Sequence, residues 1–166
     1  MASQWYSLVS QKLFLASTLL DATTLTPKKG SALTAQTLQQ EASTQGSIEL
    51  LLRARQLLLV MIARLYQKRP EGPLSLADLS SMIGDQAPEI VSLTTLERES
   101  ESWWNHLDQL ETAQNRPPAA RKTVSSENII AVSAEAGPDR SVQSLRKTLE
   151  AIKQFTDNLE EQHGEW

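Results

Sequence analysis

The feature that most constrains the fold is the most hydrophobic stretch of the chain, residues 48–66. Its apolar side chains recur at the 3.6-residue spacing of a helix. Apart from Arg55, the polar side chains of the stretch and its flank occupy only a narrow arc, formed by Glu49, Arg53, Gln56, Arg64 and Lys68. A helix that is apolar on most sides must be covered on most sides by other elements. The stretch therefore predicts the middle helix of a helical bundle.

Helical periodicity extends over much of the remaining chain. The helix containing this stretch is expected to begin at the N-cap Ser31, to kink or fray at Gly46 and to stop before Pro70. No run of alternating residues is long enough to build a sheet. The fold class predicted is all-α: an antiparallel bundle of four to five helices in a single domain, residues 1–166. Its helices are expected at 3–25, 31–69, 88–114 and 140–162, with a short one at 76–83.

A long irregular connector, residues 115–140, is expected before the last helix. It contains Pro117 and Pro118, which oppose helix formation, and an apolar island at 129–132. Two interpretations of this island stay open, a short extended segment docked on the bundle and a helical turn. Residues 97–102 are polar and predict a break, after which Ser100 or Ser102 caps a helix carrying Trp103 and Trp104. At least one of these tryptophans is expected in the core.

Composition excludes several classes of function. The chain has no cysteine, which removes disulfides, thiol nucleophiles and thiolate metal sites, and it has only two histidines. The net charge of −4 is opposite in sign to that of a typical nucleic-acid binder, so no nucleic-acid partner is expected. The longest apolar run, seven residues, is far shorter than the roughly twenty of a membrane span. We expect a cytoplasmic protein with no membrane partner, no cofactor and no metal.

Two cations occupy unexpected positions. Lys12 lies near the centre of the apolar face of the first helix, and Arg55 lies among leucines of the second. A buried cation without a partner costs several kcal/mol, so each requires either a counter-charge or a route to water. The structural interpretation is that acids such as Asp21 or Glu41, or one within 89–111, pair with them. The functional interpretation is an anion-binding cleft formed by Lys12 and Arg55, with Tyr6 and Tyr66 as hydroxyl donors.

Catalytic motifs are few. Glu160 and His163 have the spacing of one di-iron helix motif, but such sites need a second motif and two more carboxylates. Seven residues lie between Arg98 and His106, whereas the helical HEPN RNases place four to six residues between the Arg and the His. We therefore predict no catalytic residue and no metal site.

Several scattered segments give a resemblance to a known group of proteins. They are Trp5-Tyr6, Gln11–Ala16, the helix ending near Tyr66 and Pro70, and Glu101-Ser102-Trp103. With these segments the chain resembles a family of small, uncharacterised, all-helical proteins of pseudomonad-type gamma-proteobacteria. The resemblance implies a helical bacterial cytoplasmic protein and implies nothing about catalysis.

The function predicted is non-enzymatic: an interaction or adaptor bundle that binds a protein partner or itself. A homodimer would use apolar surface of the second or last helix. Two alternatives are a small-anion or small-ligand binder using Lys12 and Arg55, and a diverged HEPN-like RNase bundle without the Arg/His motif.

Overall fold

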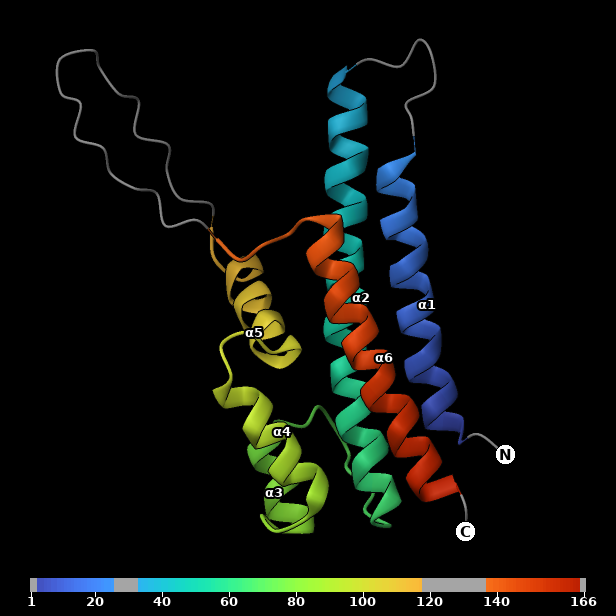
Figure 1. Cartoon of the computed structure of the whole chain (residues 1–166), viewed down its shortest axis with the longest axis vertical. Coiled ribbons are helices and arrows are strands. Elements are labelled where there is room, and N and C mark those ends of the chain that lie inside the picture. The colour runs from blue at the N-terminus through green and yellow to red at the C-terminus, as the bar shows by residue number, and fades with distance from the viewer. Residues whose placement is uncertain (1–2, 26–32, 118–136, 165–166) are drawn as a thin grey trace, which may run out of the picture.

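The structure, a computed structural model, describes residues 3–25, 33–117 and 137–164, and within these ranges it contains six helices and no strand (Figure 1). The all-α class is therefore confirmed, with six helices where four or five were expected. The sixth helix arises because the segment 88–114 is divided in two at the break that residues 97–102 predict. The helices are α1 (Gln4–Thr24), α2 (Leu33–Leu65), α3 (Leu76–Ile83), α4 (Pro88–Arg98), α5 (Trp103–Gln114) and α6 (Val142–Gly164).

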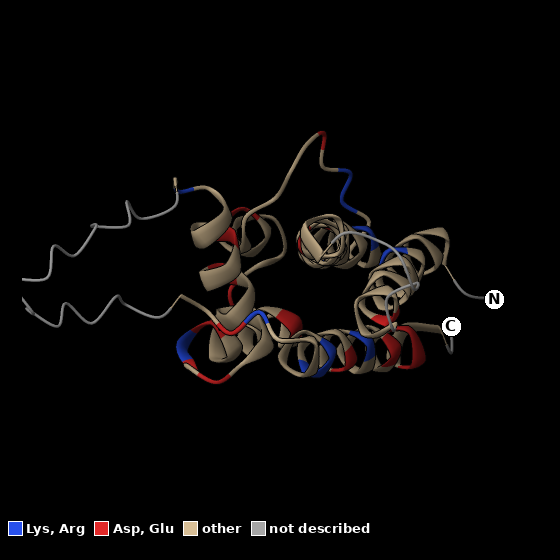
Figure 2. Cartoon of the chain, turned by 90° about the horizontal axis from the view of Figure 1, so that it is seen from above, with Lys and Arg blue, Asp and Glu red and all other residues tan. Residues whose placement is uncertain are grey.

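Three long helices lie side by side (Figure 1). α1 and α2 form an antiparallel pair, and α6 packs against both. The shorter helices α3, α4 and α5 lie on the other side of α2 from α1, so α2 is the middle helix, as its apolar stretch predicts (Figures 1 and 2). Each large apolar side chain buried between the helices contributes about 1.5–3 kcal/mol. The largest fully buried side chains are Leu20, Ile48, Leu51, Leu58, Met61, Ile62, Leu79, Leu93, Leu107, Leu110, Leu145 and Ile152.

Side-chain caps begin two of the short helices, and one of these caps, Ser102, was expected from the sequence. The Ser75 side chain accepts a bond from the Asp78 N–H, and the Asp78 carboxylate accepts one from the Ser75 N–H, which completes a capping box for α3. The Ser102 hydroxyl oxygen accepts from the Asn105 N–H and donates to the Leu96 carbonyl. This cap begins α5 and fixes the break after α4. Trp103 and Trp104 are both buried, which confirms and exceeds the expectation of one core tryptophan.

The second helix ends earlier than expected. It stops at Leu65, not at residue 69, because the chain turns before Pro70 is reached. The Lys68 N–H bonds to the Ala63 carbonyl and the Gln67 N–H to the Arg64 carbonyl, the pattern of a Schellman motif. Gln67 has φ +58°, in the left-handed region that this motif requires. The proposed Ser31 cap and the island 129–132 lie outside the described residues.

Replacing Gln67 by glycine is expected to stabilise the protein by about 1 kcal/mol. A side chain with a Cβ is strained at this φ, whereas glycine adopts it freely. Urea unfolding of the wild type and Gln67→Gly measures the difference. Gln86→Gly, also at an exposed loop position, is the control, because no positive φ is found there. Equal or lower stability of Gln67→Gly would contradict the motif.

Gly46 does not kink α2, contrary to expectation. The helix is continuous through it, and the glycine instead allows α1 to approach closely. A Cβ at this position would lie 3.0 Å from the Leu19 Cδ1 atom.

Two ion pairs connect the start of α6 to α1 and α2. Arg146 pairs with Asp21 of α1. Arg140 Nη2 lies 2.7 Å from Glu41 Oε1 of α2.

Candidate functional site

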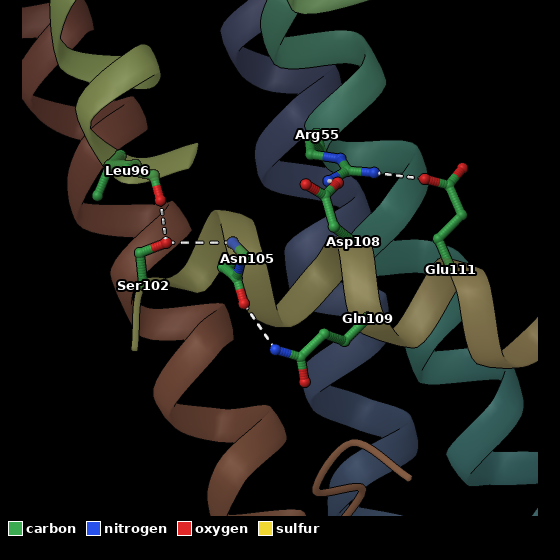
Figure 3. Close-up of polar contacts among 7 residues, drawn as sticks. All are labelled: Arg55, Leu96, Ser102, Asn105, Asp108, Gln109 and Glu111. Atoms are coloured by element: carbon green, nitrogen blue, oxygen red, sulfur yellow. Dashed lines mark hydrogen bonds and ion pairs between the residues drawn. The ribbon is translucent and has the colours of Figure 1, made fainter. Parts of the chain in front are cut away.

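Arg55 lies where the sequence placed it, in the interior of the bundle, and it is 6% exposed. Its guanidinium is held by two carboxylates of α5, with Nη1 2.5 Å from Asp108 Oδ1 and Nη2 2.6 Å from Glu111 Oε2 (Figure 3). Asp108 and Glu111 are three residues apart, a spacing that puts both on one face of a helix. The guanidinium carbon also lies 4.9 Å from the centre of the Trp104 ring. A small anion at Arg55 would therefore compete with two carboxylates already bound.

The other three predicted residues have different partners. Lys12 is half-buried, and its Nζ lies 3.5 Å from Oε1 of the adjacent Gln11. The Tyr6 hydroxyl donates to Asp157 Oδ1 of α6 at 2.8 Å, and this bond raises the pKa of Tyr6 above its usual value. Within the described ranges no hydrogen bond or ion pair joins any two of Lys12, Arg55, Tyr6 and Tyr66. An anion site formed by these four residues stays a prediction.

Tyr66 belongs to a cluster that the sequence did not reveal. Its hydroxyl donates to Glu89 Oε2 at 2.6 Å, and His163 Nε2 lies 2.9 Å from Glu89 Oε1. Glu89 is 5% exposed, and burial alone would raise its pKa, but the bonds from Tyr66 and His163 outweigh burial and hold the pKa below its usual value. Burial and the neighbouring carboxylate raise the pKa of Tyr66 to about 12. The cluster joins the turn after α2 to the start of α4 and the end of α6.

The Glu160/His163 pair does not form a metal motif in the structure. Glu160 Oε1 accepts from the Ser3 N–H at 2.8 Å, while His163 contacts Glu89. In the part of the chain that is described, no group of three or more His, Asp or Glu side chains is arranged to hold a metal ion.

His106 is half-buried beside a hollow of about 710 Å³ between α5 and α6. Its Nε2 lies 2.7 Å from the Asp139 carbonyl oxygen and must donate to it, and its Nδ1 lies 2.6 Å from the Thr148 hydroxyl. Both ring nitrogens are thus engaged in holding the start of α6 against α5. Arg98 is exposed at the end of α4, so it is not on the helix that carries His106, as the RNase motif requires.

The outer face of α1 is the most unusual surface among the described residues. α1 lies at the edge of the bundle, away from α3–α5 (Figures 1 and 2). Its 21 residues carry only two charged side chains, whereas seven of the 23 residues of α6 are charged. Figure 2 shows α6 as alternating blue and red and α1 as mostly tan. Exposed residues recur along α1 and its C-cap at alternating spacings of three and four: Gln4, Ser7, Gln11, Phe14, Thr18, Asp21 and the C-cap residue Leu25.

Phe14 is the prominent side chain of this face. It is the eleventh of the 21 residues of α1, and it is 71% exposed. Leu25 at the end of the same face is also 71% exposed. Asp21 is already paired with Arg146 of α6. The apolar stripe of α1 does not reveal this face, because Phe14 lies off that stripe. The signal in the sequence is the low number of charged residues in the helix that carries the phenylalanine.

Comparison with known proteins places the chain in a family. The model of a family of unknown function (DUF6586) matches residues 1–166. No curated protein and no solved structure is significantly similar to the chain. Among the described helices, none combines the length and hydrophobicity that are needed to cross a membrane. The match confirms the expected membership of an uncharacterised family, while the gamma-proteobacterial source stays a prediction.

Proposed function

The chain belongs to DUF6586, a family of unknown function, and from its own surface we propose that it is a non-enzymatic interaction protein that binds a partner helix along the outer face of α1. The observation that carries this proposal is the exposure of Phe14 at the middle of an almost uncharged helix face. This face is on the first helix, whereas the sequence pattern predicted an interaction surface on the second or the last helix.

The chemistry of the face suits a helical partner. Ser, Thr and Gln side chains lose less on leaving water than charged ones, so covering this face has a small desolvation cost. Aromatic side chains are frequent anchors of protein interfaces because they bury a large area. The alternating spacing of three and four residues is the seam along which two helices pack side by side. A helix laid along α1 would cover Phe14 and leave no charge unpaired, since Asp21 is bound to Arg146.

The polar clusters of the interior support binding over catalysis. Arg55, Glu89 and His106 each bond to side chains or backbone of another helix or its flanking turn. Their polar groups are thus engaged in fixing the helices, which leaves the surface of the bundle as the region for recognition. The anion-binding and RNase alternatives have no comparable observation in their favour.

Photocrosslinking in cells that normally make this protein tests the proposal. Benzoylphenylalanine placed at position 14 of the full chain is expected to form a crosslink that mass spectrometry maps to one helical segment of a protein. The same probe at position 150, an exposed position of the charged face of α6, is the control and is expected to give only background. No specific product at position 14, or the same products at both positions, would contradict the proposal.

A further inference from the structure

We propose that the partner helix is α1 of a second copy of this chain, packed antiparallel so that Phe14 of each copy meets at a two-fold axis. This inference rests on the proposed function, since it identifies the partner of the same face. The pairing buries the two exposed phenylalanines against each other and forms a symmetric dimer.

The position of Phe14 makes the face complementary to itself. A two-fold contact requires that each residue on one side of the axis meet a suitable residue on the other. With Phe14 on the axis, Gln11 lies opposite Thr18 of the other copy, and Ser7 lies opposite Asp21. The small Ser and Thr side chains leave room for the aromatic rings, and the Gln and Ser side chains can hydrogen-bond across the seam.

Charge favours this face and this direction for a contact between two copies. The chain has a net charge of −4, so two copies repel wherever their charged faces meet. Among the described helices, α1 has the lowest proportion of charged residues, two of 21. A parallel pair would place Asp21 against Asp21, whereas the antiparallel pair separates these carboxylates by about 21 Å along the axis. The dipoles of antiparallel helices also attract each other.

The size of the face predicts a weak dimer. A 21-residue helix is about 31 Å long, and a helix–helix contact of that length buries about 1,000 Å² in total, the lower limit for a specific interface. Interfaces of this size are typical of transient complexes. We therefore expect a dissociation constant in the micromolar range, with monomer and dimer in exchange.

Sedimentation velocity of the purified full chain over the micromolar range is expected to show a shift from monomer to dimer. Phe14→Glu places two charges at the axis and is expected to weaken the dimer at least about 30-fold. Val91→Glu on α4 is the matched control, because Val91 is also an exposed apolar residue of a helix, at 51%. A wild type that stays monomeric, or equal weakening by both variants, would overturn the dimer. Circular dichroism verifies that both variants stay helical.

Disulfide trapping tests the direction of the pair in a protein that has no cysteine of its own. Tagged Gln11→Cys is mixed with untagged Thr18→Cys and mildly oxidised. The antiparallel pair predicts that the mixed disulfide predominates, because these positions face each other across the axis. A parallel pair would instead link each variant to itself, and that result, or no crosslink, would overturn the proposal.

The crosslinking outcome at position 14 separates the two proposals. A product that contains only this chain supports both. A product with another protein, together with a monomer in sedimentation, refutes the second copy as partner and leaves the interaction role standing. Absence of any specific product, together with a monomer in sedimentation, refutes both.

Discussion

Removing both carboxylates that hold Arg55, in the double variant Asp108→Ala and Glu111→Ala, is expected to destabilise the protein by about 3–5 kcal/mol. The arginine is 6% exposed, and the bonds to these two side chains satisfy its charge. Without them a buried cation keeps only its contact with the Trp104 ring, which is worth about 1–2 kcal/mol at most.

Removing the arginine is expected to destabilise the protein less than removing its two carboxylates does. Arg55→Met is expected to lose only about 1–3 kcal/mol, because the side chains of Asp108 and Glu111 are 44% and 45% exposed and can be solvated by water. The methionine also fills part of the space. Equal losses in the two variants would indicate that lost packing, and not an unpaired charge, sets the cost.

Urea unfolding at neutral pH measures these differences. The double variant Glu97→Ala and Glu150→Ala is the matched control, since it also removes two carboxylates, both of them exposed. It is expected to change the free energy of unfolding by no more than about 0.5 kcal/mol per site. A loss in the control as large as that of the Asp108/Glu111 variant would show that net charge, and not Arg55, is responsible.

Glu89→Ala is expected to be the second most damaging of these changes, at about 2–4 kcal/mol at neutral pH. Glu89 is buried, and it accepts a bond from Tyr66 and contacts His163, so the substitution removes two interactions with a charged group. It also disconnects the end of α6 from the start of α4. The same measurement applies, with Glu97→Ala on the exposed side of α4 as control.

This cluster also predicts a pH dependence of known sign. The pKa of Glu89 is lower in the folded protein than its usual value of 4.5, so on acidification the unfolded chain takes up the proton first. The stabilisation is complete above pH 4.5 and is lost as the pH falls toward the folded pKa. Glu89→Gln lacks this group, so the wild type is expected to lose its advantage over this variant in acid. A constant difference from neutral to acidic pH would contradict the assignment.

Much of the secondary structure could be predicted because its causes are local. The capping box of Ser75 and Asp78 spans four residues, and the break before Trp103 depends on Ser102 and its immediate neighbours. The end of α2 could not be placed in the same way, because Gln67 adopts a left-handed conformation that glutamine does not favour by itself.

The candidate sites were harder to predict because their partners are distant in the chain. The pattern around Arg55 indicated a buried cation, but its carboxylates are 53 and 56 residues away. Glu89 gave no signal, since its burial depends on packing at the ends of α2 and α6, and His163 is 74 residues away. A spacing rule on one helix cannot identify contacts between helices whose relative rotation is set by packing.

The sequence by itself determined that the chain is helical, where most helices begin and end, and which helix is central, because hydrogen bonds within a helix and the period of its apolar side chains are properties of adjacent residues. Only the tertiary structure decided which charges neutralise each other and which helix face is left uncovered. Those outcomes depend on how the six described helices pack against one another. α1 lies at the edge of the bundle, and its outer face is covered by no other described helix.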